Sequence, residues 1–292
     1  MDSNQDLKTL VRDKYAEIAK GDKAVIQASC CGATNSSQEV YNIMSDEYEM
    51  EGYKEEADLG LGCGLPTQYA MIKEGDTVVD LGSGAGNDCF VARHESGPTG
   101  KVIGIDFTPE MIHLARKNAA VNGFNNVEFR QGDIENMPVT EQTVDVVVSN
   151  CVLNLLPKKD KIFHEIYRVL KPSGHFSISD IVLEGDLPKE LTQAAEMYAG
   201  CVSGAIQKSD YLSLIREAGF EEVTIQKEKA IIIPDDILQD YMSMEEIASF
   251  KSGATGIYSI TVFGRKSDSD VHNDALSFVE GAGVCTPGGG CC

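Results

Sequence analysis

Residues 78–88 read VVDLGSGAGND, a β-branched run that passes directly into a loop with glycine at every second position. Glycine lets a backbone approach a ligand closely, and the first N–H groups of a following helix can point at that ligand. The dinucleotide fingerprint G-x-G-x-x-G, counted from Gly82, would need glycine where the chain has Asn87. The stretch therefore predicts a nucleotide-type cofactor loop between a strand and a helix, with Asp80 as the acidic residue ahead of it.

Strands and helices alternate after this loop. Runs rich in β-branched residues predict strands at 77–81, 101–106, 126–133, 144–150 and 174–183, and helical patterns at 109–123 and 159–174 lie between them. Regular alternation of this kind implies a parallel sheet with helices on both faces. The predicted fold class is α/β, a doubly wound, mostly parallel sheet, followed by a C-terminal α+β extension with strands at 221–229 and 256–266.

The composition divides the chain into four parts. Residues 1–60 hold an amphipathic helix at 6–20 and a polar loop at 28–37, which contains Cys30 and Cys31. Residues 61–185 form the predicted cofactor-binding part, and residues 186–265 form the α+β part, with helices near 187–199, 209–218 and 236–247. Residues 266–292 are a polar tail that we expect to be disordered, with cysteines at 285, 291 and 292.

The charge of the chain limits its partners. The 292 residues carry a formal net charge of -21, which argues against nucleic acid and against an anionic membrane surface, since both attract clustered Lys and Arg. The same charge favours neutral or cationic ligands. There is no apolar run of about 18 residues and no signal-peptide pattern at the start, so we expect a soluble protein of the cytoplasm. The sequence leaves the oligomeric state open.

Nine cysteines, an odd number without a secretory signal, argue against a disulfide framework. The five histidines are scattered and no C-x-x-C pair is present, which counts against a structural zinc site. Three cysteines have glycine-, asparagine- or serine-flanked contexts: Cys63 in LGLGCG, Cys151 in VSNCVLNLL and Cys201 in YAGCVSGA. Ligands of open parallel sheets bind at the carboxyl ends of the strands, so Cys151, directly after the fourth strand, is expected at that edge. Whether Cys63 and Cys201 fold over the same edge stays open from the residues alone.

The glycine loop and two later acids resemble the cofactor site of class I S-adenosylmethionine-dependent methyltransferases. Asp106 closes the second strand, where an acid can accept the ribose hydroxyls, and the resemblance places Asp133 at the adenine amino group and Ile134 on the adenine ring. Taken alone, both acids could equally be helix caps or turn formers. Met111 is a candidate to cover the ribose or adenine, and Asn150 a candidate to contact cofactor or substrate. The expected cofactor-binding set is Asp80, Gly82, Gly84, Gly86, Asp106, Met111, Asp133, Ile134 and Asn150.

Seven segments across about residues 60–205 closely resemble the arsenite methyltransferase family. In order they read GLGCG, DLGSGAGNDCF, GIDFTPEMI, NVEFRQGDIENMPV, VSNCVLNLLP, VLKPSGHFSISDIV and EMYAGCVSGA. The resemblance implies that the thiolates of Cys63, Cys151 and Cys201 bind trivalent arsenic and that S-adenosylmethionine methylates it, a detoxification reaction. It also implies thioredoxin or glutathione as the partner that reduces the enzyme. Cys89, in the same stretch as the glycine loop, is expected to be a small buried side chain rather than a ligand.

The implied chemistry is physically sensible. Trivalent arsenic is soft, takes three ligands, exchanges hydroxide for thiolates and keeps a lone pair that can attack a sulfonium methyl group. Placing the two reactants together can remove about 7 to 11 kcal/mol from the barrier. Two other functions remain open at this point. One is a class I methyltransferase for a carbon or oxygen acceptor, such as a quinone precursor, with incidental thiols; the other is a non-catalytic thiol protein that binds arsenic or a soft metal.

Overall fold

The computed structural model describes residues 3–21, 51–187, 189, 202, 204–253 and 255–268. Most of the helix predicted near 187–199 and most of the tail predicted from residue 266 lie outside these ranges. Six of the nine cysteines also lie outside the described residues, namely Cys30, Cys31, Cys201, Cys285, Cys291 and Cys292.

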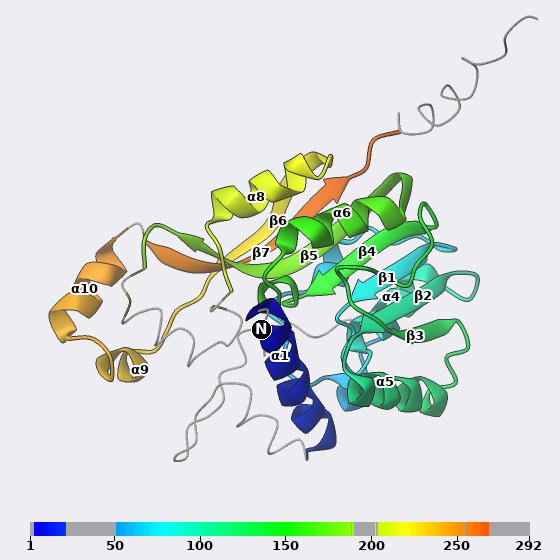
Figure 1. Cartoon of the computed structure of the whole chain (residues 1–292), viewed down its shortest axis with the longest axis horizontal. Coiled ribbons are helices and arrows are strands. Elements are labelled where there is room, and N and C mark those ends of the chain that lie inside the picture. Colours follow the sequence, from blue (N-terminus) through cyan, green and yellow to red (C-terminus); the bar gives the residue numbers. More distant parts are fainter. Residues whose placement is uncertain are drawn as a thin grey trace, which may run out of the picture.

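A seven-stranded sheet forms the centre of the molecule, in the order β3-β2-β1-β4-β5-β7-β6 (Figure 1). The strands are β1 (Thr77–Leu81), β2 (Lys101–Asp106), β3 (Val127–Gln131), β4 (Val144–Asn150), β5 (Leu170–Glu184), β6 (Glu221–Ala230) and β7 (Gly256–Arg265). The first five are parallel, and β7 pairs antiparallel with both β5 and β6. This confirms the predicted doubly wound, mostly parallel α/β fold.

Helices cover both faces of the sheet (Figure 1). They are α1 (Ser3–Lys20), η1 (Glu55–Ala57), α3 (Pro66–Tyr69), α4 (Asn87–Ser96), α5 (Pro109–Val121), η2 (Leu153–Leu155), α6 (Lys159–Val169), α8 (Lys208–Glu217), α9 (Asp235–Gln239) and α10 (Met244–Ser252). Successive strand residues point to opposite faces. Val79 of β1 therefore shares a buried cluster with Phe163 of α6, whereas Val78 shares the opposite cluster with Phe90 of α4.

Two predicted helices differ from the observed ones. The helix expected at 159–174 ends at Val169, and β5 begins at Leu170, because Pro172 disfavours helical backbone at the residue before it. The single helix expected near 236–247 is two helices, α9 and α10. The second begins with a capping box, in which the Ser243 side chain and the Glu246 side chain bond each other's backbone N–H, so a new helix starts there.

Helix α1 lies against α5 beside the carboxyl ends of the strands (Figure 1). Ile18 of α1 and Met111 of α5 form a small buried cluster. Lys8 forms ion pairs with Asp133 at 2.6 Å and with Glu135 at 3.0 Å. The predicted N-terminal helix therefore covers the edge of the sheet where a ligand is expected. Among the described residues, no helix is both long enough and apolar enough to cross a membrane.

Candidate functional site

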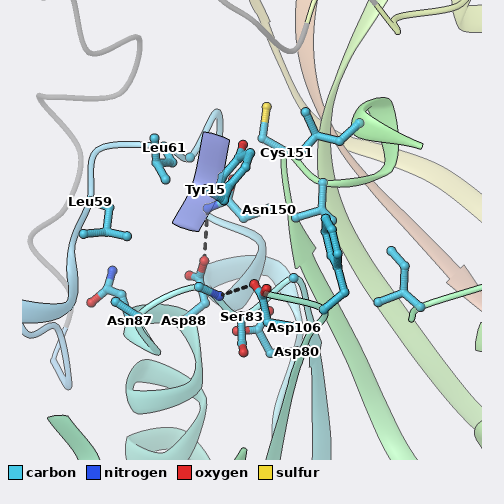
Figure 2. A pocket seen from close by; sticks show the side chains of 18 of the residues that line it. Tyr15, Leu59, Leu61, Asp80, Ser83, Asn87, Asp88, Asp106, Asn150 and Cys151 are labelled. Carbon is cyan, nitrogen blue, oxygen red and sulfur yellow. Dashed lines mark hydrogen bonds between the residues drawn. The ribbon is translucent and has the colours of Figure 1, made fainter. Parts of the chain in front are cut away.

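A cavity opens at the carboxyl ends of β1, β2 and β4, where the strand order reverses between β1 and β4. Open α/β sheets bind ligands at this position. The cavity takes in about 940 Å³ of space, including the part open to solvent. Figure 2 shows Asp80, Asp88 and Asp106 toward one end of the cavity and Cys151 toward the other. Tyr15 of α1 and Asn150 also line it.

The glycine loop forms one wall of the cavity. Gly82, Gly84 and Gly86 all have left-handed backbone, with φ of 69°, 50° and 100°. A side chain on Gly82 would also lie 2.5 Å from Val152, so both the conformation and the space require glycine there. Gly86 is the N-cap residue of α4, which confirms the predicted order of strand, loop and helix.

Asp106 at the end of β2 holds this loop in place. One carboxylate oxygen accepts the Gly84 N–H at 3.1 Å, and the other accepts the Thr108 N–H at 2.8 Å. Asp106 therefore acts as a turn former, as one interpretation of the sequence allowed, and its side chain also lines the cavity. Thr108 is the N-cap residue of α5, with Pro109 at the first helical position.

Buried aspartates make the cavity strongly acidic. Burial raises the pKa of Asp80 well above its usual range, and the charge of Asp88 adds to that rise. Burial also raises the pKa of Asp88, from 3.8 to about 6. The Cys89 thiol donates to Asp80 at 3.2 Å, and one Asp88 oxygen is buried with no hydrogen-bond partner among the described residues. A cation in the cavity would stabilise both carboxylates, because it offsets the cost of their desolvation.

Asn150, the last residue of β4, links three parts of the site. Its side-chain oxygen accepts the N–H groups of Cys63 at 3.0 Å and Gly64 at 3.2 Å. Its side-chain nitrogen donates to the Gly64 carbonyl at 2.9 Å and to Asp88 at 3.1 Å. A single amide thereby holds the Cys63 loop, the end of β4 and the start of α4 together.

The structure brings two of the three predicted thiols together. The sulfur atoms of Cys63 and Cys151 and a carboxylate oxygen of Asp180 all lie within 4.8 Å of one another, and all three residues are buried. Neither cysteine forms a disulfide. Cys151 has left-handed backbone, with φ of 60°, and its N–H donates to the Ser179 carbonyl at 2.8 Å. The carbonyl of Cys63 accepts a hydrogen bond from Ser259 of β7.

Cys201 lies outside the described residues, but the residues that follow it contact this site. Val202 is buried in the same cluster as Cys63 and Cys151. The Gly204 carbonyl accepts a hydrogen bond from the buried Lys159 ammonium at 2.8 Å. A side chain on Gly204 would lie 1.8 Å from the backbone oxygen of Asn154, so this segment packs directly on η2.

Comparison with known proteins agrees with this geometry. A family model described as a methyltransferase domain matches residues 72–219. The crystal structure of an arsenic(III) S-adenosylmethionine methyltransferase from Chlamydomonas reinhardtii superposes with a TM-score of 0.60 and 32% identity, covering 71% of this chain and 68% of that one. The chain belongs to the arsenite methyltransferase family.

Two curated members of the arsenite methyltransferase family are also similar to this chain. The protein of Halobacterium salinarum is 43% identical over 230 residues, which are 76% of this chain and 59% of that protein. The protein of Aquipseudomonas alcaligenes is 32% identical over 237 residues, which are 79% of this chain and 66% of that protein. The chain thus spans about three-fifths to two-thirds of the length of these two relatives.

The predicted site residues of this arsenite methyltransferase family member fall into two groups. Those that line the cavity are Asp80, Gly82, Gly84, Asp106, Asp133, Ile134, Asn150 and Cys151. Three described ones do not: Gly86 packs on Phe129, Met111 is buried beneath α1, and Cys63 is buried beside Cys151. The roles of both groups in binding stay predictions. Cys89 is fully buried, as expected.

Sequence reasoning missed three residues of this site. Tyr15 and Asp88 line the cavity, and Asp180 lies beside the thiols. Asp88 follows the glycine loop in the first turn of α4, where an acid is common for helix stability alone. A signal for Asp180 was present, because a carboxylate inside the apolar run of β5 must be buried and therefore needs partners.

Proposed function

We propose that this chain transfers the methyl group of S-adenosylmethionine to trivalent arsenic held by the thiolates of Cys63, Cys151 and Cys201, giving methylated arsenicals for detoxification. The observation that carries the proposal is that Cys151 lines the end of an acidic cavity that starts at the glycine loop, with the Cys63 thiol directly beside it. Membership of the arsenite methyltransferase family supports the same substrate.

The cavity suits S-adenosylmethionine because this cofactor carries an ammonium and a sulfonium charge. Asp80 and Asp88, which are buried beside the glycine loop, would stabilise these charges. Gly82, Gly84 and Gly86 give the loop its shape. Asp106 would accept the ribose hydroxyls, Asp133 would receive the adenine amino group and Ile134 would pack on the ring, with Met111 supporting them from beneath α1. Asn150 would hold the donor end of the cavity together.

The thiols supply the acceptor. Each thiol that replaces a hydroxide on arsenite passes its proton to that hydroxide, which leaves as water, and thiolates are the ligands that soft arsenic prefers. The arsenic lone pair then displaces the thioether of the cofactor and forms the arsenic–carbon bond, so S-adenosylhomocysteine leaves. Arsenic is formally oxidised by two electrons. Two enzyme thiols return these electrons by forming a disulfide, and we propose thioredoxin or glutathione as the reductant that reopens it.

The direct test supplies arsenite, S-adenosylmethionine and a thiol reductant to the full chain and separates the arsenic species over time. We expect methylated arsenic and S-adenosylhomocysteine to appear together. Cys151→Ser should stop the first methylation, whereas Cys285→Ser, the same chemical change outside the proposed site, should leave it intact. No methylated arsenic from the unaltered chain would refute the proposal.

The two alternative functions give different results in the same assay. A methyltransferase for a carbon or oxygen acceptor should keep its turnover in Cys151→Ser when its own acceptor is supplied. A binding protein should take up arsenite but release no S-adenosylhomocysteine. The family membership favours neither alternative.

A further inference from the structure

Arsenic chemistry does not account for the carboxylate of Asp180 beside the two thiols. This carboxylate is fully buried in the C-terminal half of β5, and one of its oxygens lies within 4.8 Å of the sulfur atoms of Cys63 and Cys151. Arsenite needs only soft thiolates, and a buried carboxylate without a function would be costly. We propose that Cys63, Cys151 and Asp180 form a binding site for a divalent thiophilic cation of the zinc class, which competes with arsenite for the two thiols.

The spacing of the three ligand atoms is close to that of a zinc site. Zinc binds cysteine sulfur at about 2.3 Å and carboxylate oxygen at about 2.0 Å, and its ligands are tetrahedral. Neighbouring ligand atoms are then about 3.5 to 3.8 Å apart. The upper limit of 4.8 Å in this structure means that each pair of ligand atoms must approach by at most about 1.3 Å to close the site. Three protein ligands leave the fourth position to water.

The ligands are held in position by their surroundings. The Tyr211 hydroxyl donates to one oxygen of Asp180 at 3.2 Å, and the Ile181 N–H donates to the other at 3.0 Å. Hydrogen bonds with the side chains of Asn150 and Ser259 hold the backbone of Cys63. A hydrogen bond to the Ser179 carbonyl holds the backbone of Cys151. Groups that orient metal ligands in this way are a regular part of metal sites.

The charges also balance for a divalent cation. Two thiolates and one carboxylate bring three negative charges, a divalent ion offsets two of them, and the buried Lys159 ammonium near Asp180 offsets the third. The sequence shows no metal-binding motif here, because Cys63 and Asp180 are more than 100 positions apart and the ligands include no histidine.

The experiment uses Co²⁺ as a spectroscopic probe for zinc. The full-length, reduced chain carries serine at 30, 31, 285, 291 and 292, so that thiols in those stretches do not contribute. We expect Co²⁺ to produce a thiolate-to-cobalt absorption band and the visible bands of tetrahedral cobalt, and both Zn²⁺ and arsenite to abolish them. Asp180→Asn should weaken cobalt binding at least tenfold, which corresponds to about 1.4 kcal/mol. Arsenite binding, which depends on the thiols alone, should change by less than about threefold.

Three further variants complete the test. Asp145→Asn, the same change at an ion pair with Lys171, should leave cobalt binding unaltered, and Cys151→Ser should abolish it. Tyr211→Phe keeps the thiols and the carboxylate and should weaken cobalt binding about tenfold; it decides the question if Asp180→Asn fails to fold. Absence of the thiolate–cobalt band, or equal cobalt affinity with and without the Asp180 carboxylate, would overturn the inference. It needs the two thiols but no arsenic methylation, so either proposal can fail without the other.

Discussion

Replacing Asn150 with alanine should loosen the site more than any other single truncation of a cavity residue. The change removes the acceptor of the Cys63 and Gly64 N–H groups and the donor to Asp88. A buried polar group left without its partner costs about 1 to 3 kcal/mol. Water from the cavity can reach part of these groups, so we expect the free energy of unfolding to fall by about 2 to 4 kcal/mol.

The same change should weaken cofactor binding. S-adenosylmethionine would then have to order the Cys63 loop and the Asp88 side chain on binding, and a cost of about 1.4 kcal/mol corresponds to a tenfold higher dissociation constant. Urea denaturation gives the stability and calorimetric titration gives the dissociation constant. Asn150→Asp keeps the acceptor but loses the donor and sets a second negative charge beside Asp88, so it should also bind the cofactor poorly.

Asn126 offers a matched control far from the cavity. Its side chain donates to the carbonyls of Gly97 and Gly100 at 3.0 Å each and accepts from Arg93 at 3.2 Å. Asn126→Ala should therefore cost a similar amount of stability and leave the affinity for S-adenosylmethionine unchanged. Equal dissociation constants for the Asn150 and Asn126 variants would refute the view that Asn150 organises the site.

Three other predictions concern pH and glycine positions. Because the pKa of Asp88 is raised to about 6, the ligand-free protein should lose up to about 3 kcal/mol of stability as pH rises from about 4 to about 6. The affinity for the cationic cofactor should rise over the same range. Asp88→Asn should flatten both pH curves, measured by unfolding and by calorimetric titration. Gly82→Ala and Gly123→Ala introduce the same left-handed strain, at φ of 69° and 67°, but only the first creates a clash. Thermal melts should therefore show an extra loss of stability of about 1 to 3 kcal/mol for Gly82→Ala, and only this variant should bind the cofactor more weakly. Gly204→Ala should displace the segment after Cys201 and weaken arsenite binding, measured by equilibrium dialysis. Gly253→Ala, where the added side chain meets only ordinary van der Waals contacts, should have no effect. Equal arsenite affinities of the two variants would contradict the packing argument.

The sequence was sufficient for the sheet because local patterns specify it. The strands at 77–81, 101–106 and 144–150 have the predicted bounds, since each is an apolar β-branched run that ends at a polar residue or a glycine. The glycine loop was equally readable, because left-handed backbone next to a ligand requires this residue type. These features depend on residues that are neighbours in the chain, so they can be predicted from the sequence.

The details of the site were harder to predict because they depend on contacts between distant segments. Nothing near Asn150 in the sequence shows that its amide bonds Cys63, 87 positions away. The sequence indicates that Asp180 is buried in the apolar run of β5, but only the fold shows that it lies beside the two thiols. The resemblance to a family led to Cys63, but only the folded chain shows that its sulfur reaches Cys151.

The hydrogen bond between Ser259 and the Cys63 carbonyl spans 196 positions of the chain. Ser259 lies on β7, which pairs with β5 and cannot do so until residues 256–265 have been synthesised. On the ribosome, the partly synthesised chain therefore lacks the contact that fixes the Cys63 loop, and the two thiols are not yet a preorganised pair. The close pair of thiols that arsenic could bridge is therefore assembled only after β7 has been synthesised and has paired with β5.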